Sequence, residues 1–344
     1  QEQFNLIGAG RRNLVINGAM QVAQRGTSFT TIASNVYNAC DRFIQEFPSG
    51  VFSVNQTQET DGPAGFKYSN KWAATAGASL AAGNYAIPFE YRVEGYDATR
   101  LGWGTTEGKD VTLSFWIKSN RTGINTIDFT LQGSATNPFI ARQYTINSAD
   151  TWEYKTITIP GHTTTTSINS ANTQAFSIFW WALAGSTFNS GAIADKWGVQ
   201  TAANRAVGVQ STIASGDYWQ LTGVQLELGK VATPFEHRSY GEELALCQRY
   251  YQRGISNGAL GVSLNSTLAT FGFRLAVEMR TEPTVSLISG SSMPCDMTGI
   301  SGSVTWTPTS FRFKGRLGFT GYGAINSLGA LGNPIEPKGD YVQA

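Results

Sequence analysis

Two stretches of strictly alternating apolar and polar residues constrain the fold of this chain most. In residues 111–118 every second side chain is apolar, namely Val111, Leu113, Phe115 and Ile117. Residues 218–228 alternate in the same way and place Val224, Leu226 and Leu228 on one side. Successive side chains of a β-strand point to opposite faces, so each stretch predicts a strand with one face in a core.

Further segments rich in β-branched and aromatic residues are separated by turn-rich loops. We expect strands at residues 41–47, 51–57, 85–93, 126–132, 142–146, 154–159 and 176–183. Pro88, inside the third of these, cannot donate a backbone hydrogen bond and predicts an edge strand or a bulge. About nine strands without intervening helices predict an all-β fold, a β-sandwich of the jelly-roll type.

The pattern changes once, after residue 238. Ser239 and Glu242 have the spacing of a capping box, and the apolar residues that follow recur at helical intervals, which predicts a helix of about four turns. The Gly-rich remainder again resembles strands, at residues 261–264, 270–278, 284–289, 303–306, 310–313 and 321–325. We therefore expect an N-terminal arm at 1–13, a jelly-roll sandwich at 14–238, a short linking helix at 239–254 and a smaller C-terminal β domain at 255–344.

Composition argues against several classes of protein. Charged residues make up 14% of the 344, the net charge is +1, and no basic stripe is present, so we expect no nucleic-acid binding. The longest apolar stretch, around residues 176–184, is far shorter than the roughly 20 residues of a membrane-spanning helix, so we expect no membrane insertion. Cys40, Cys247 and Cys295 form no CxxC pair and are expected to be buried small hydrophobes rather than disulfides or zinc ligands.

The residues for catalysis are scarce. His162 and His237 are the two histidines, and neither has a second metal ligand at helical spacing. No GxSxG, P-loop, dinucleotide-binding or HExxH motif is present. We expect a protein that is not an enzyme, with no catalytic residue, no metal and no cofactor. A glycosidase needs two carboxylates, so a polysaccharide depolymerase stays open, although Glu90, Glu94, Asp97, Asp128 and Asp195 form no distinctive pair.

Sugar binding has better support, because aromatic residues reach 12% and include 9 tryptophans. A tryptophan ring can lie against the C–H face of a sugar. Trp72, Trp103 and Trp197 fall in loop-like, polar surroundings and are the candidate glycan-binding residues. The same residues can instead cap the end of a sandwich, so a structural role stays open for them. Four tryptophans lie within strand patterns and are expected in the core: Trp116, Trp180, Trp181 and Trp219.

Three blocks of sequence carry a resemblance. They are residues 13–27 with 41–43, residues 113–119 with 150–153, and above all the long block 219–251, which includes WQLTGVQLELG and ATPFEHRSYGEELALCQRYY. The chain resembles the tail fibres or receptor-binding proteins of tailed marine and cyanobacterial phages that contain a carbohydrate-binding-module-like jelly-roll domain. The resemblance covers about two-thirds of the chain and implies no specific ligand-binding residues.

The resemblance implies a structural protein of the virion, at the surface of the tail or capsid, that attaches to host surface polysaccharide. It also implies a homotrimer, contacts with other tail or capsid proteins, and a structural rather than catalytic His237. Two alternatives remain open. One is a capsid-surface or tail-connector protein that binds no glycan, and the other is a tailspike depolymerase.

Overall fold

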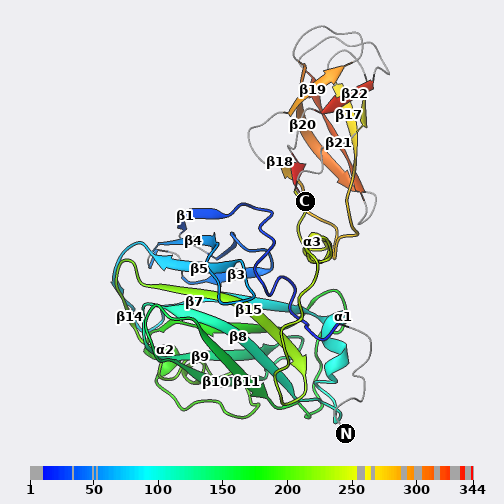
Figure 1. Cartoon of the computed structure of the whole chain (residues 1–344). Helices are drawn as coiled ribbons and strands as arrows, with labels where there is room; N and C mark the ends of the chain where they lie inside the picture. Colours follow the sequence, from blue (N-terminus) through cyan, green and yellow to red (C-terminus); the bar gives the residue numbers. More distant parts are fainter. Residues whose placement is uncertain are drawn as a thin grey trace. The chain divides into compact units, whose positions relative to one another are not determined.

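The computed structural model describes residues 11–32, 35–48, 50–51, 53–253, 260–264, 268–287, 293–297, 304–313, 318–325, 334–337 and 342–343. The chain divides into two compact units, Gln1–Tyr240 and Gly241–Ala344. We call them the sandwich unit and the barrel unit (Figure 1). The expected sandwich and C-terminal domain fall on opposite sides of this boundary.

The sandwich unit consists of two antiparallel sheets, which confirms the mostly-β sandwich (Figure 1). The first sheet has the order β1 (Ser28–Ile32), β4 (Val54–Glu59), β5 (Ser69–Ala74), β15 (Tyr218–Leu228), β8 (Val111–Ser119) and β11 (Glu153–Ile159). The second sheet has the order β10 (Phe139–Ile146), β9 (Gly123–Leu131), β12 (Gln174–Trp181), β7 (Tyr85–Glu94), β3 (Phe43–Glu46) and β2 (Val36–Tyr37), and β13 (Leu183–Ala184) pairs with β7. A small separate pair joins β14 (Thr212–Ile213) to β6 (Ala78–Ser79).

The core lies between the two sheets and confirms the alternation in residues 111–118. All four apolar side chains of that stretch are completely buried. Phe115 of the first sheet meets Trp180 of the second with ring centroids 5.9 Å apart and nearly perpendicular planes. Burying a large apolar side chain contributes about 1.5–3 kcal/mol, so such contacts hold the sheets together.

Pro88 marks a bulge. Ile44 of β3 pairs with Glu90 of β7, whereas Glu46 pairs with Ile87, so β7 contains one extra residue between the two pairs. Strand β7 lies between β12 and β3 and is therefore interior. Of the two alternatives that proline allowed, the bulge is the one present, because the extra residue removes the need for a ladder hydrogen bond from Pro88.

The start of the described chain is built into the sandwich. Asn13 is buried, and its Oδ1 accepts hydrogen bonds from the backbone N–H groups of Val15 (2.9 Å) and Leu226 (3.0 Å). Arg238, near the end of the unit, donates to the carbonyl oxygens of Asn13 and Val15. Glu236 accepts from the Asn13 N–H at 2.6 Å. We call these contacts the polar staple. The predicted arm lies mostly outside the described residues, and its last residue is held by the staple.

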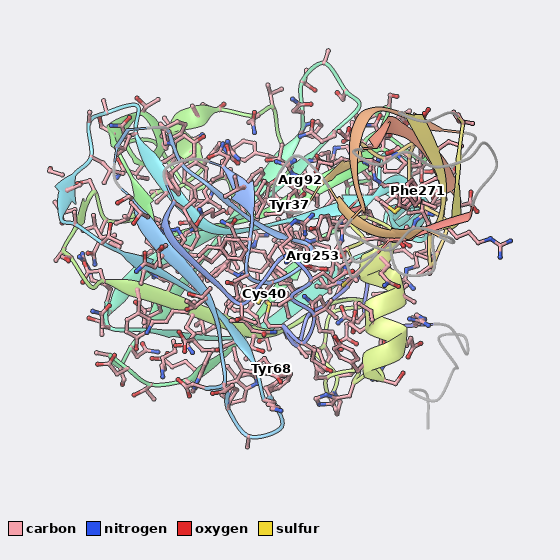
Figure 2. The ribbon with its side chains drawn as sticks, turned by 90° about the horizontal axis from the view of Figure 1, so that it is seen from above. Tyr37, Cys40, Tyr68, Arg92, Arg253 and Phe271 are labelled. Atoms are coloured by element: carbon pink, nitrogen blue, oxygen red, sulfur yellow. The ribbon has the colours of Figure 1, made fainter. Side chains whose placement is uncertain are left out.

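Short helical turns interrupt the strands of the sandwich unit. They are α1 (Gly95–Ala98), the 3-10 turns η1 (Thr99–Leu101) and η2 (Ala202–Asn204), and α2 (Ser186–Asn189). The predicted linking helix is present as α3 (Tyr240–Gln248) but is shorter than four turns. At its end the carbonyl of Cys247 accepts from the N–H groups of both Tyr250 and Tyr251, so the last turn tightens toward a 3-10 geometry. Cys40, labelled in Figure 2, and Cys247 are buried and form no disulfide with each other, whereas the Cys295 side chain lies outside the described residues.

The barrel unit contains a closed barrel. Its order is β16 (Leu260–Ser263), β17 (Leu268–Arg274), β21 (Gly318–Ile325), β20 (Val304–Phe313), β19 (Met293–Met297) and β22 (Pro334–Pro337), and a separate pair joins β18 (Ser286–Leu287) to β23 (Val342–Gln343). The two strands expected at 303–306 and 310–313 are one strand, β20, with an irregularity between Pro308 and Ser310. Strands β19 and β22 were not predicted, since prolines lie inside or at the ends of both.

Candidate functional site

Trp72 is not in a loop. It lies in the middle of β5, is completely buried, and packs against Trp219 with ring centroids 5.7 Å apart. The prediction that Trp72 contacts a glycan is therefore wrong, because the indole presents no surface to a ligand. The strand is hard to predict from the sequence because the polar residues Asn70 and Lys71 precede Trp72. Asn70 nevertheless points inward with Trp72 and is buried.

Trp103 and Trp197 do lie in loops, and they pack edge to face with ring centroids 5.2 Å apart. The indole N–H of Trp103 donates to the carbonyl of Lys109 at 2.7 Å, and that of Trp197 donates to the carbonyl of Pro160 at 2.7 Å. Each ring thus has its single donor bound to backbone, which fixes its orientation.

A pocket of about 330 Å³ opens beside Trp103, and we call it the end pocket. Its large apolar lining residues are Ile168 and two that are otherwise buried, Trp103 (8% exposed) and Phe176 (1% exposed). The rest of its lining is mostly hydroxyl and amide residues: Thr99, Thr105, Thr166, Ser167, Asn169 and Ser170, with Ala98, Gly102 and Gly104. The lining comes from the segment after β7, from the loop between β11 and β12, and, with Phe176, from the start of β12. Trp197 does not line the pocket but backs Trp103.

Gly104 holds the two pocket loops together. Its N–H donates to the carbonyl of His162, and its carbonyl accepts from the N–H of Thr166, each at 3.0 Å. A Cβ at this position would stand 2.5 Å from the Thr166 carbonyl oxygen, and the φ of +82° also favours glycine. The loops can approach this closely only with glycine there.

His162 belongs to the packing behind the pocket. Its side chain is buried, and its ring stands perpendicular to that of Trp197 with centroids 5.2 Å apart. Loss of solvent lowers the pKa of His162 from its ordinary value of 6.5. The imidazole is therefore held in its neutral form, which suits a structural role.

The end pocket fits a small neutral ligand. Its volume is at the lower end of the roughly 300–1,000 Å³ that ligand pockets occupy. None of its lining side chains is charged. A lining that combines apolar side chains with hydroxyl and amide groups suits a ring that has one apolar face and several hydroxyl groups.

Carboxylates lie elsewhere in the sandwich. Glu90 and Asp128 are buried on the outer side of the second sheet. Glu90 is paired with Arg92, labelled in Figure 2, at 2.7 Å. Asp128 accepts from the indole N–H of Trp181 at 2.7 Å and from Arg205 at 2.9 Å. Neither carboxylate lines the end pocket.

No described group of three or more His, Cys, Asp or Glu side chains could hold a metal ion. Within the same described part of the chain, no helix is long and apolar enough to cross a membrane.

Trp116 lies in a strand as predicted, but the prediction that it is buried in the core is wrong. Trp180, Trp181 and Trp219 are buried as expected, but Trp116 is half-buried and points away from the core. The alternation that buries Phe115 and Ile117 puts Trp116 on the other face of β8. The same alternation in the sequence therefore predicts that Trp116 lies on the outer face of the first sheet.

No protein-family model matches the sequence, and no curated protein matches it. Several solved structures resemble the sandwich. They include the enzymatically active domain of bacteriophage CBA120 tailspike protein 4 (14% identity, 63% of this chain and 21% of that chain, TM-score 0.32) and TmCBM61 in complex with β-1,4-galactotriose (8% identity, 64% and 100%, TM-score 0.32). A putative sugar binding protein from Bacteroides thetaiotaomicron is a third (10% identity, 63% and 100%, TM-score 0.34). The sandwich is thus similar to carbohydrate-binding-module sandwiches and to a tailspike domain, of whose length the chain spans about a fifth. Similarity at this distance does not place the chain in a family.

Proposed function

We propose that the sandwich unit is a glycan-binding module of the jelly-roll type, and that the end pocket takes one neutral sugar ring. The observation that carries this proposal is the lining of the pocket, in which Ile168 and the edge of the largely buried Trp103 lie among uncharged hydroxyl and amide residues. A pyranose presents C–H groups on one face and hydroxyls at its edge, so it matches both parts of the lining. The locked indole loses little freedom on binding, which favours affinity.

The protein we propose is a tail fibre or receptor-binding protein at the virion surface that attaches to host polysaccharide. The sequence blocks at residues 13–27 and 219–251 support this assignment. We also propose a homotrimer. A pocket this small gives weak binding, and several copies on one particle would multiply that binding without any new contact.

We propose binding without cleavage. Hydrolysis of a glycosidic bond uses a pair of carboxylic side chains on either side of the bond. The lining of the end pocket contains no Asp or Glu, and Glu90 and Asp128 are engaged by basic or indole donors on the other side of the second sheet. Incubation with host lipopolysaccharide or capsule should leave the chain length of the polysaccharide unchanged, and shortened chains would indicate a depolymerase instead.

The test of the end pocket is titration calorimetry with a panel of neutral monosaccharides and with purified host polysaccharide. Ser167→Trp fills the pocket from its rim and should weaken binding at least tenfold. Ser190→Trp places the same side chain at an exposed position outside the pocket and should bind like the wild type. Equal binding by both variants, or no binding by the wild type, would refute the proposed function.

A connector without glycan binding is the remaining alternative. A virion reconstruction separates the two. The end pocket should face outward in an adhesin, whereas a sandwich buried against other tail or capsid proteins would favour the connector.

A further inference from the structure

The outer face of the first sheet carries aromatic side chains that the core does not use. Alternation along β8, β11 and β15 turns Trp116, Tyr154 and Tyr218 away from the core, and Trp152 and Phe66 join them from adjoining loops. We call these five residues the aromatic strip. Trp116 and Tyr154 sit directly opposite each other on neighbouring strands, with ring centroids 5.2 Å apart. Tyr154 is 45% exposed, so the strip reaches solvent.

A bulge in β15 makes room for the strip. The pairing of β15 with β8 shifts between Thr222 and Gln225, and Gly223 within the shift has a φ of +62°. A Cβ on Gly223 would lie 2.8 Å from Cζ of Phe66 and 2.9 Å from Cδ1 of Trp116. The two rings therefore rest on bare backbone, which brings them together on the surface.

Asp61 supplies a fixed acceptor beside the strip. It is paired with Lys118, and it accepts from the Trp152 indole N–H at 3.4 Å and from the Gln220 amide at 3.3 Å. The hydrogen bond from Lys118 is the main cause of a lowered pKa of Asp61, so the carboxylate is charged. A carboxylate has about four acceptor positions, and the side chain of Asp61 is still 51% exposed, so it can accept from a ligand hydroxyl.

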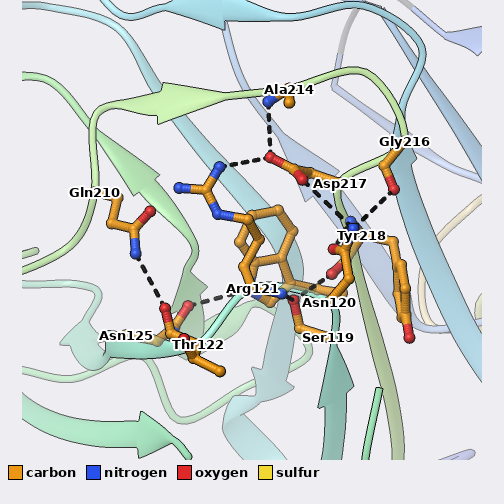
Figure 3. A network of polar contacts seen from close by, with 11 residues as sticks. Ser119, Asn120, Arg121, Thr122, Asn125, Gln210, Ala214, Gly216, Asp217 and Tyr218 are labelled. Atoms are coloured by element: carbon orange, nitrogen blue, oxygen red, sulfur yellow. Dashed lines mark hydrogen bonds and ion pairs between the residues drawn. The ribbon is translucent and has the colours of Figure 1, made fainter. Parts of the chain in front are cut away.

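Tyr218 at the other side of the strip is also held in place. Its hydroxyl donates to Asp150 at 2.5 Å, and its N–H donates to Oδ1 of Asn120 at 3.0 Å. Figure 3 shows the network behind it, in which Asp217 accepts from Arg121 at 2.5 Å. These bonds fix the start of β15 and hold the half-buried ring of Tyr218, which lowers the ordering cost of binding.

Basic groups on this face are partly used within it. Lys71, Gln220 and Lys118 stand in register on three adjacent strands. Lys118 is paired with Asp61, and the ammonium group of Lys71 lies 4.6 Å from the ring centroid of Tyr218. The face therefore offers rings, amides and balanced charges rather than an excess of positive charge.

We propose that the aromatic strip is a second binding surface and that its occupant is an extended, neutral polysaccharide chain. This inference rests on the proposed function and extends it from one sugar ring in a pocket to a polymer on an open face. Aromatic rings on several strands suit consecutive sugar rings, and the balanced charges favour a neutral over an acidic polymer. A second copy of the protein is a poorer occupant, because a dry interface would remove water from the half-exposed Asp61 carboxylate and its partner Lys118, which is unfavourable.

The experiment is affinity electrophoresis of the full chain in gels that contain dextran, galactomannan, mixed-linkage β-glucan or xyloglucan, with alginate as the acidic polymer. We expect at least one neutral polymer to retard the wild type. Tyr154→Ala removes an exposed ring and Asp61→Asn removes the fixed charge, and each should weaken that retardation about tenfold. Tyr240→Ala removes a somewhat more exposed aromatic ring (56%) outside the strip and should leave the retardation unchanged.

Several results would overturn the proposal. They are retardation by alginate alone or by no polymer, retardation that neither strip variant weakens, and a change in sedimentation mass on Tyr154→Ala, which would make a second copy the occupant. The Ser167→Trp variant distinguishes a failure of the aromatic-strip proposal from a failure of the proposed function. If Ser167→Trp abolishes monosaccharide binding while the strip variants retain polymer binding, the end pocket stands and the strip does not. If the wild type binds no glycan, both fail.

Discussion

Gly223 and Trp116 are in such close contact that a single added methyl group at residue 223 would stand 2.9 Å from the Cδ1 atom of the indole. The glycine also has a left-handed backbone conformation. Gly223 thus lies within a bulge, has a positive φ that favours glycine, and leaves the space that the Trp116 ring occupies.

Gly223→Ala should destabilise the sandwich unit for two reasons. A left-handed conformation costs a non-glycine residue about 1–2 kcal/mol, and the added Cβ also displaces Trp116 and Phe66. Urea unfolding measures the sum. Gly216→Ala is the matched control, because Gly216 has a φ of +86° and open space around it. An equal loss of stability in the two variants would contradict the crowding at Gly223.

Glu153 should make stability depend on acid pH. Although desolvation opposes the shift, hydrogen bonds from Lys155 and from the N–H groups and amide of residues 147–148 lower the pKa of Glu153 from 4.5 to about 2. The unfolded chain therefore binds a proton more readily, and the stabilisation is lost as pH falls from 4.5 toward 2. The same bonds hold the loop that carries Asp150 and Trp152.

Unfolding midpoints of the wild type and Glu153→Gln measured between pH 2 and 6 test this. The variant should be less stable than the wild type at pH 6 and should lose less stability on acidification. Glu107→Gln, at an exposed position, should keep the wild-type profile. Parallel profiles for wild type and Glu153→Gln would count against the role of this carboxylate.

His162 should add a second pH dependence. Because burial lowers its pKa below 6.5, the unfolded state binds the proton more readily as pH falls. Stability should therefore decline from about pH 6.5 downward, until the folded-state pKa is reached. Thermal unfolding at pH 7.5 and pH 5 should show a smaller difference for His162→Gln than for the wild type. His237→Gln, at an exposed histidine, should keep the full difference.

Asp128→Ala should be strongly destabilising. The carboxylate accepts from Trp181 and Arg205, and the guanidinium of Arg205 also lies 4.8 Å from the Trp181 ring centroid. Removing one partner of a fully buried ion pair costs about 3–5 kcal/mol. The Arg205 side chain is 16% exposed and can be partly hydrated, but the Trp181 N–H also loses its acceptor, so we expect a loss near the lower end of this range. Guanidinium unfolding should show a loss in this range, and Asp195→Ala, at an exposed carboxylate, should show little change.

The strands were predictable where one face alone is apolar. Residues 111–118 have that pattern, and the structure buries all four apolar side chains. In residues 218–228 the structure buries Val224 and Leu226, whereas Leu228 is half-buried. Strand β5 was missed because its inward face includes Asn70, so the period-2 signal fails beside Trp72. Trp116 was misplaced for a different reason: membership of a strand was equated with burial, whereas a strand has two faces.

The end pocket was predictable only in part. Trp103 is marked by its loop composition, but Ile168 and Phe176 lie more than sixty residues further along the chain, in the loop between β11 and β12 and at the start of β12. Local sequence contains no signal for that approach. The close approach of the two loops requires a glycine at position 104, but the sequence alone does not show why a glycine is there. The structure shows the reason: a Cβ would clash with the carbonyl oxygen of Thr166.

The polar staple has a mechanical consequence. Asn13 and Arg238 join the first and last parts of the sandwich unit directly, and Leu226 of β15 is bonded to both Asn13 and Leu14. Tension applied between the two ends of this unit would therefore run through a few short hydrogen bonds and bypass most of the sheets. Those bonds would have to rupture before any strand peeled away, so the end pocket and the aromatic strip would keep their shape while the chain is being pulled.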